Sequence, residues 1–174
     1  MSRVLYLLGT AAPPVMEFPT VVANAQSRGW EVCVGLTPTA ARWLGTSVEE
    51  LAELTGYPVK SEYRLPGDSD GWPRATAAIL APATLNSVNA VALGLTPSWP
   101  IGYAVEAIGR RARLVVMPCV KDTMAAHPQF PKSVETLRAA GVQVLLGPGG
   151  FVPHASGQAQ PYPWGAALCA AEET

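Results

Sequence analysis

Four segments of this sequence combine small, hydroxyl or charged residues directly after apolar runs, where they could meet a ligand. The first is Gly9-Thr10-Ala11-Ala12, which follows the apolar residues 4–8 and precedes a predicted helix. Small residues at a helix start let backbone N–H groups approach an anion closely. The segment lacks the full Gly-x-Gly-x-x-Gly pattern and the lysine of a P-loop, so a plain strand-to-helix turn explains it equally well.

Two further segments place hydroxyl groups at predicted helix starts. Thr37-Pro38-Thr39 offers two hydroxyls that could bind a phosphate or cap the following helix. Pro82-Ala83-Thr84-Leu85-Asn86-Ser87 offers Thr84 and Asn86 as polar groups at a strand end, although Thr84 could also cap a helix. Both segments therefore fit either an anion site or ordinary helix capping.

The fourth segment is a polar stretch after an apolar strand, Pro118-Cys119-Val120-Lys121-Asp122-Thr123-Met124, followed by Ala125-Ala126-His127-Pro128. Loops on a rigid scaffold often carry functional residues. Lys121 could hold a carboxylate through a charge-assisted hydrogen bond, or it could be an ordinary solvated lysine. Cys119 could be a nucleophile, but Lys121 is the only basic partner that the sequence suggests for it.

The elements that must position these segments alternate between strand and helix. Short apolar runs predict strands, and longer stretches with capping residues and terminal glycines predict helices. We predict strands at 3–8, 31–36, 59–63, 77–81, 114–117 and 142–146, and helices at 19–28, 40–54 (with a Ser47/Glu50 capping box), 84–93, 99–112, 133–140 and 164–171.

This alternation indicates an α/β fold, a Rossmann-like (flavodoxin-like) three-layer sandwich with a mainly parallel sheet, built as one domain over residues 1–174. In such sheets, ligands bind outside the carboxyl ends of the strands. All four polar segments follow a predicted strand. We therefore expect them to meet at one edge of the sheet.

Composition narrows the classes of partner. Charged residues make up 14% of the 174 residues and the net charge is −1, so nucleic acid is an unfavourable partner. No apolar stretch approaches the ~18 residues of a membrane span, and residues 4–8 are too short for a secretion signal. Three separated cysteines and two histidines match no metal-ligand spacing. We expect a cytoplasmic protein that binds no membrane, no nucleic acid and no metal.

The apolar content also favours self-association. Hydrophobic residues make up 49% of the chain, and a domain of this size often buries more apolar surface by forming oligomers. The segment Trp99-Pro100-Ile101 is our candidate for a contact between copies.

The third and fourth segments resemble the two signatures of the flavin-containing cysteine decarboxylase family. This family includes phosphopantothenoylcysteine decarboxylases and lantibiotic-type peptidyl-cysteine decarboxylases. Its first signature, Pro-Ala-Ser-Ala-Asn-Thr, is similar to residues 82–87, and its second, Pro-x-Met-Asn-x-x-Met-Trp, is similar to residues 118–125. The resemblance extends over nearly the whole chain.

The resemblance implies a bound flavin, FMN or, alternatively, FAD, and a homo-oligomer, a trimer or a dodecamer. It implies that flavin oxidises the C-terminal cysteine of a peptide, or a related small thiol, to a thioaldehyde, which then loses CO₂. The residues expected at the cofactor are Gly9, Thr10, Ala11, Thr37, Thr39, Pro82, Ala83, Thr84, Asn86 and Ser87.

The sequence departs from the family at its catalytic positions. The family's histidine, roughly fifteen residues before the first signature, falls on Asp68, and the carboxylate-holding asparagine is replaced by Lys121. We expect Lys121 to hold the substrate, and Asp68 or His154 to move protons. The alternatives are that Asp68 merely forms a loop with its neighbouring glycines and that His154 is structural. His127 is a further candidate acid or base.

The glycine- and proline-rich residues 147–163 correspond in position to the family's substrate-covering loop. Phe151, Tyr162 and Trp164 could pack over a peptide or the flavin, and we expect Met124 and Phe151 to contact substrate. An irregular tail is the alternative. Other functions left open are a flavin prenyltransferase-like enzyme, a flavin reductase and a non-catalytic flavin-binding subunit.

Overall fold

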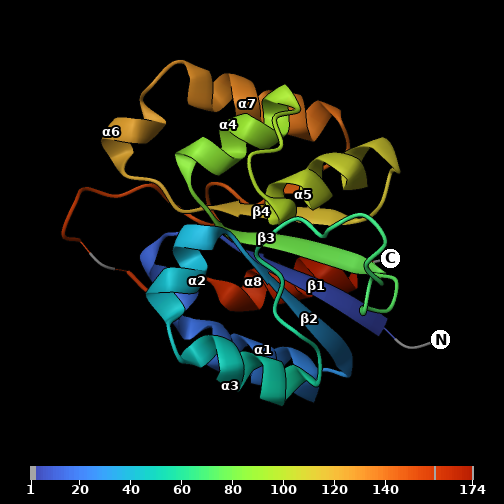
Figure 1. The fold of residues 1–174 in the computed structure, drawn as a ribbon. Coiled ribbons are helices and arrows are strands. Elements are labelled where there is room, and N and C mark those ends of the chain that lie inside the picture. Colours follow the sequence, from blue (N-terminus) through green and yellow to red (C-terminus); the bar gives the residue numbers. More distant parts are fainter. Residues whose placement is uncertain (1–2, 159, 174) are drawn as a thin grey trace.

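The apolar runs of the sequence form one parallel sheet in the computed structural model, which describes residues 3–158 and 160–173. The strand order is β2-β1-β3-β4-β5, and every neighbouring pair is parallel. This confirms the predicted α/β architecture (Figure 1). The strands are β1 (Arg3–Gly9), β2 (Trp30–Leu36), β3 (Ala77–Ala83), β4 (Leu114–Pro118) and β5 (Gln143–Val144).

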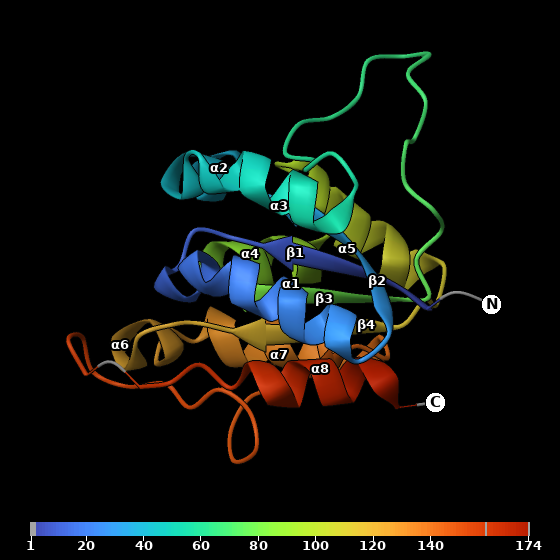
Figure 2. The ribbon, with the colours of Figure 1, turned by 90° about the horizontal axis from the view of Figure 1, so that it is seen from below.

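Helices cover both faces of the sheet (Figures 1 and 2). α1 (Phe18–Ser27) and α8 (Trp164–Glu172) lie on one face, and α4 (Leu85–Leu93), α5 (Trp99–Gly109) and α7 (Gln129–Ala139) lie on the other. The remaining helices are η1 (Pro13–Glu17), α2 (Pro38–Leu44), α3 (Ser47–Thr55), which packs against α1 and β2, and α6 (Asp122–Ala125).

Helical periodicity explains how these helices attach to the sheet. α1 buries Phe18, Val21, Val22 and Ala25, which are spaced so that they form a single stripe along the helix. The strands show no alternation of buried and exposed residues, because helices cover both faces of the sheet. For example, β3 is buried at all seven positions.

Several predicted boundaries differ from the structure. Residues 59–63 form no strand, only an isolated bridge between Gly35 and Lys60. Ser47 is the first residue inside α3 and Thr46 precedes it with no side-chain cap, so the predicted capping box is absent. β5 is shorter than predicted because Leu146 instead bridges to Phe151.

The candidate contact between copies is largely internal. Ile101 is 2% exposed and Pro100 is also buried. A Cβ on Gly35 would lie 2.9 Å from the Trp99 ring, so this ring packs directly on β2. The segment is therefore part of the chain's own core. Within the described ranges, no helix is both long and apolar enough to cross a membrane.

Arg111 ends α5 in a conformation that normally favours glycine. Its φ is 53°, and the N–H groups of Ala112 and Arg111 donate to the carbonyls of Ala107 and Ile108. This is a Schellman motif with arginine at the left-handed position.

Replacing Arg111 by glycine should stabilise the protein by about 0.5–1 kcal/mol. The left-handed conformation costs a non-glycine residue roughly 1–2 kcal/mol, and the extra flexibility of glycine in the unfolded chain offsets part of this gain. Urea denaturation measures the change. Arg110→Gly is the matched control, because φ at Arg110 is −82° and glycine there should destabilise. Equal effects of the two substitutions would contradict the argument.

Candidate functional site

The carboxyl ends of β1 and β3 are joined through the side chain of Thr10, which is 1% exposed. Its hydroxyl donates to the Pro82 carbonyl over 2.7 Å and accepts from the Thr84 N–H over 3.1 Å. The Thr10 N–H also donates to Pro82, over 3.2 Å. These bonds bring the first and third polar segments together at one edge of the sheet, as their positions after strands predicted.

Backbone donors without partners gather at this edge. In the described part of the chain, the N–H groups of Ala11, Leu85 and Asn86 have no acceptor. Leu85 and Asn86 begin α4, whose N-terminal dipole favours a negative charge. Donors of this kind, close to small residues, suit a phosphate or carboxylate.

The threonines after β2 and β3 cap helices. The Thr37 hydroxyl accepts from the Ala40 N–H over 3.4 Å, and the Thr84 hydroxyl accepts from the Ser87 N–H over 3.3 Å. The Thr37 N–H donates to the Gly9 carbonyl, which places α2 beside the end of β1. The exposed Thr39 accepts from Arg42 over 3.0 Å. Both capping threonines therefore border the site while holding its helices.

Gly9 has a packing role. A Cβ at this position would lie 2.5 Å from Cζ of Phe18 and 2.9 Å from Cγ2 of Val15. Only glycine lets η1 and the start of α1 pack so closely against the end of β1. The turn that presents the Ala11 N–H thus depends on this contact.

A second group of predicted residues gathers around α6. Lys121 forms a parallel bridge with His154, and the Asp122 N–H donates to the His154 carbonyl over 3.1 Å. Lys121 and Met124 are exposed, Met124 to 46%. His154 is half-buried, and its ring centroid lies 5.8 Å from that of Phe151. The structure therefore brings these four predicted residues to one place.

The three aromatic residues expected to cover a ligand instead point into the core. Phe151, Tyr162 and Trp164 are each 5–7% exposed. The Tyr162 hydroxyl donates to the Met117 carbonyl over 2.6 Å, and burial raises the pKa of Tyr162 well above its usual value. These rings anchor residues 147–163 to β4, and the polar residues between Phe151 and Tyr162 form the exposed part of the loop. The anchoring bond of Tyr162 is a feature that the sequence analysis missed.

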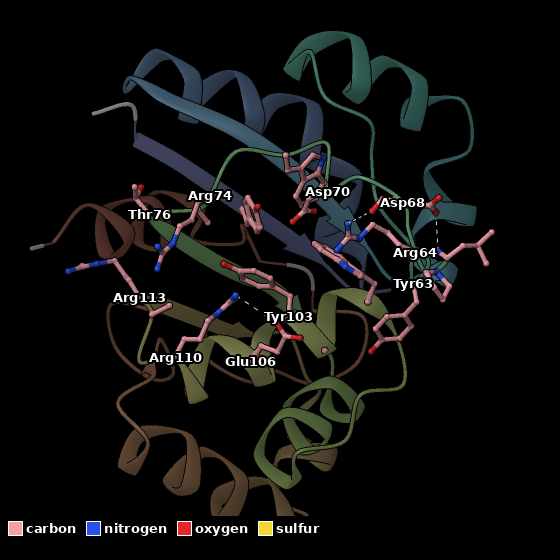
Figure 3. Close-up of a pocket in the computed structure, with 18 of the residues that line it drawn as sticks. Tyr63, Arg64, Asp68, Asp70, Arg74, Thr76, Tyr103, Glu106, Arg110 and Arg113 are labelled. Carbon is pink, nitrogen blue, oxygen red and sulfur yellow. Dashed lines mark hydrogen bonds and ion pairs between the residues drawn. The ribbon is translucent and has the colours of Figure 1, made fainter.

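Asp68 lies elsewhere. Its carboxylate accepts from the Leu65 N–H over 3.0 Å, and Arg64 donates to its carbonyl. Asp68 lines a cavity beside α5 (Figure 3), and no contact joins it to Lys121 or His154 within the described residues. The structure thus favours the loop-forming alternative for Asp68. Among the described residues, no group of three or more His, Cys, Asp or Glu side chains is arranged to hold a metal ion.

Comparison with known proteins identifies the family of this chain. The family described as Flavoprotein matches residues 2–166. The chain belongs to the flavoprotein family. No curated protein matches the chain.

Solved structures of flavoproteins show the same fold. The FMN-dependent cysteine decarboxylase TvaF from thioviridamide biosynthesis is 20% identical, with a TM-score of 0.74 over 99% of this chain and 100% of that chain. The peptidyl-cysteine decarboxylase EpiD is 16% identical, with the same TM-score and coverage. MrsD from Bacillus sp. HIL-Y85/54728 is 19% identical, with a TM-score of 0.74 over 98% of this chain and 94% of that chain.

Cys119 of this flavoprotein is unsuited to nucleophilic chemistry at neutral pH. Burial raises the pKa of the Cys119 thiol to about 11, and the thiolate is the reactive form. We expect iodoacetamide to modify the exposed Cys169 first. Cys119 should react slowly near pH 7, with a rate that rises roughly tenfold per pH unit, as mass spectrometry can measure. Fast labelling of Cys119 in the folded protein at pH 7 would contradict this expectation.

Proposed function

We propose that this flavoprotein binds FMN at the carboxyl edge of its sheet and oxidatively decarboxylates the C-terminal cysteine of a peptide, or a related small thiol. The observation that carries the proposal is the convergence of unpaired backbone N–H groups on the Thr10 junction between β1 and β3. The relatives described as FMN-dependent cysteine decarboxylases support the choice of cofactor and reaction.

The residues at this edge fit the phosphate of FMN. The N–H groups of Ala11, Leu85 and Asn86 would donate to phosphate oxygens, and the dipole of α4 would favour the negative charge. The proposal also includes the other residues predicted from the sequence to bind the cofactor: Gly9, Thr10, Thr37, Thr39, Pro82, Ala83, Thr84 and Ser87. FAD carries a comparable phosphate and stays as the alternative.

Flavin, when bound, supplies a two-electron acceptor for the carbon that carries the substrate thiol. The protein's own part is to hold the carboxylate and to take the thiol proton. Lys121 would bind the carboxylate through its ammonium group, with the exposed Met124 against the peptide; the buried Phe151, predicted to contact substrate, would instead support the loop that carries His154. Loss of a hydride from the HS–CH₂ carbon and of the thiol proton would give a thioaldehyde. When the bond from Cα to the carboxylate then breaks, its electron pair would move into the thiocarbonyl, leaving an enethiolate as CO₂ departs.

His154 suits proton transfer better than Asp68 does. The Nδ1 atom of His154 lies 3.1 Å from the Ala155 carbonyl, so in the neutral ring a proton on Nδ1 would be donated there and Nε2 would be free to accept another. His154 also adjoins Lys121 through the backbone bridge. Asp68 would need the loop that carries it to move toward the carboxyl edge.

A non-catalytic flavin-binding subunit is the second candidate. The separation of Asp68 from Lys121 and His154 favours this alternative. In either case we propose a cytoplasmic homo-oligomer, a trimer or a dodecamer.

Purified protein tests the proposal directly. We expect a yellow protein with a flavin spectrum that releases CO₂ from peptides ending in cysteine, but not from the same peptides ending in serine. A colourless protein that binds neither FMN nor FAD would exclude flavin chemistry. Bound flavin without CO₂ release would leave the binding-subunit function in its place.

A further inference from the structure

A cavity of about 790 Å³ opens between residues 63–76 and α5, away from the carboxyl edge (Figure 3). Its walls come from the loop before β3, from α5 and from the residues that follow α5. One end adjoins Thr76 and Arg113, which precede β3 and β4 and so mark the amino edge of the sheet. β3 has seven residues and spans roughly 20 Å at ~3.3 Å per residue. This end of the cavity therefore lies far from Thr84.

Arginines surround this end of the cavity. Figure 3 shows Arg74 and Arg110 near Tyr103, whereas the Arg113 guanidinium is directed away from Tyr103, toward α8. Arg74 has no ion pair or side-chain hydrogen bond with the described residues. Arg110 is 3.8 Å from the Glu106 carboxylate, a long ion pair, and Arg113 donates to the Ala170 carbonyl of α8 over 3.5 Å. Arg111 also lines the cavity, so positive charge accumulates here without close carboxylate partners.

Aromatic rings form the adjoining wall. Tyr103 is half-buried, and its ring centroid lies 4.8 Å from that of Tyr6 and 5.9 Å from that of Trp99. Burial raises the pKa of Tyr103, so this hydroxyl stays neutral. Trp72 packs against Trp99 with centroids 5.1 Å apart. The wall is thus rigid. The Arg110 guanidinium carbon lies over the Tyr103 ring, 5.2 Å from its centroid, so the ring and the guanidinium together form the surface at this end of the cavity.

At the other end of the cavity, the carboxylate of Asp70 is already paired with a cation. The Lys60 ammonium lies 4.2 Å from the Trp72 centroid and 2.5 Å from the Asp70 carboxylate. Asp68 lies on the same loop. The cavity therefore has one basic end and one balanced end, which orients an elongated ligand with its negative group toward Arg74 and Arg110.

We propose that this cavity is a second ligand site, which binds a small molecule carrying both a planar ring and a phosphate, as a nucleoside diphosphate does. Guanidinium groups bind phosphate through paired hydrogen bonds, and a ring stacked on an aromatic side chain contributes further affinity. The site is independent of the carboxyl edge and of any reaction there.

Titration of ADP and UDP into the protein, with and without saturating FMN, tests the proposal by calorimetry. We expect binding in both conditions, and at least tenfold weaker binding of adenosine and of inorganic phosphate. Arg74→Ala and Arg110→Ala should each weaken ADP binding by about tenfold, the loss expected for one charged hydrogen bond. Tyr103→Leu should weaken ADP binding but leave phosphate binding unchanged.

Arg42→Ala is the matched control, because Arg42 lies on α2 and contacts Thr39. Its ADP affinity should equal that of the unaltered protein. Failure of both nucleotides to bind at millimolar concentration, displacement of FMN by ADP, or unchanged ADP affinity in Arg74→Ala and Arg110→Ala would each overturn the proposal. If these variants instead change the mass of the assembly without changing ADP affinity, the cavity is covered by a second copy and the proposal fails.

Discussion

Replacing Thr10 by valine is expected to lower the free energy of unfolding by about 2–3 kcal/mol and to remove most bound flavin. The buried Thr10 hydroxyl donates to the Pro82 carbonyl and accepts from the Thr84 N–H. Valine has nearly the same shape but makes neither bond. The Thr84 N–H then loses its acceptor, while the Pro82 carbonyl keeps only the bond from the residue 10 N–H, and an unsatisfied buried polar group costs about 1–3 kcal/mol. Denaturant unfolding and the flavin absorbance of purified protein measure the two effects.

Thr39→Val is the matched control. Thr39 borders the same edge, but it is exposed and its hydroxyl accepts only from the exposed Arg42. Exposed substitutions of this kind usually change stability by less than about 0.5 kcal/mol. Thr39→Val is the control for stability alone, because Thr39 is itself a proposed flavin-binding residue. If the two substitutions lower the free energy of unfolding equally, Thr10 does not hold the two strand ends together.

The five strands of the sheet, and the edge at which the polar segments meet, could be predicted from the sequence. Continuous apolar runs predict buried parallel strands, and parallel strands place all their carboxyl ends at the same side. For this reason Thr10 and Thr84, which are far apart in sequence, could be expected to approach one another. Their hydrogen bonds follow from the order of the strands rather than from any local motif.

Segments without periodicity were predicted less well. Residues 57–76 have no regular pattern, so sequence spacing alone put Asp68 near the family's catalytic position. In the structure, hydrogen bonds within the loop hold the Asp68 carboxylate, while the contacts of Lys60 with Asp70 and Trp72 fix the loop beside α5. These contacts depend on the tertiary fold.

The aromatic residues of the last loop illustrate a second limit. An aromatic ring in a glycine- and proline-rich loop can face a ligand or the core, and sequence does not distinguish the two. Tyr162 turns inward because its hydroxyl finds the Met117 and Pro118 carbonyls at the end of β4. A buried tyrosine hydroxyl needs such a partner. The approach of Lys121 to His154, by contrast, requires only that the loop return past α6.

Replacing Lys121 by alanine should weaken binding of a cysteine-terminated peptide by roughly ten- to hundredfold, while the flavin content stays unchanged. A charged hydrogen bond contributes about 1.5–3 kcal/mol, and each ~1.4 kcal/mol corresponds to a tenfold change in affinity. Lys121→Asn should restore part of the binding, because a neutral amide can still donate to a carboxylate. Calorimetry with flavin-loaded protein measures these affinities.

A peptide with an amidated C-terminus separates this role from a general loss of structure. It lacks the carboxylate, so we expect it to bind equally weakly to the unaltered protein and to Lys121→Ala, which completes a double-mutant cycle. Lys132→Ala is the control variant, since Lys132 is an exposed lysine on the neighbouring α7. A cation stabilises the carboxylate before CO₂ leaves, so the loss in Lys121→Ala should appear in KM more than in kcat. Unchanged peptide affinity in Lys121→Ala would show that this lysine is an ordinary surface charge.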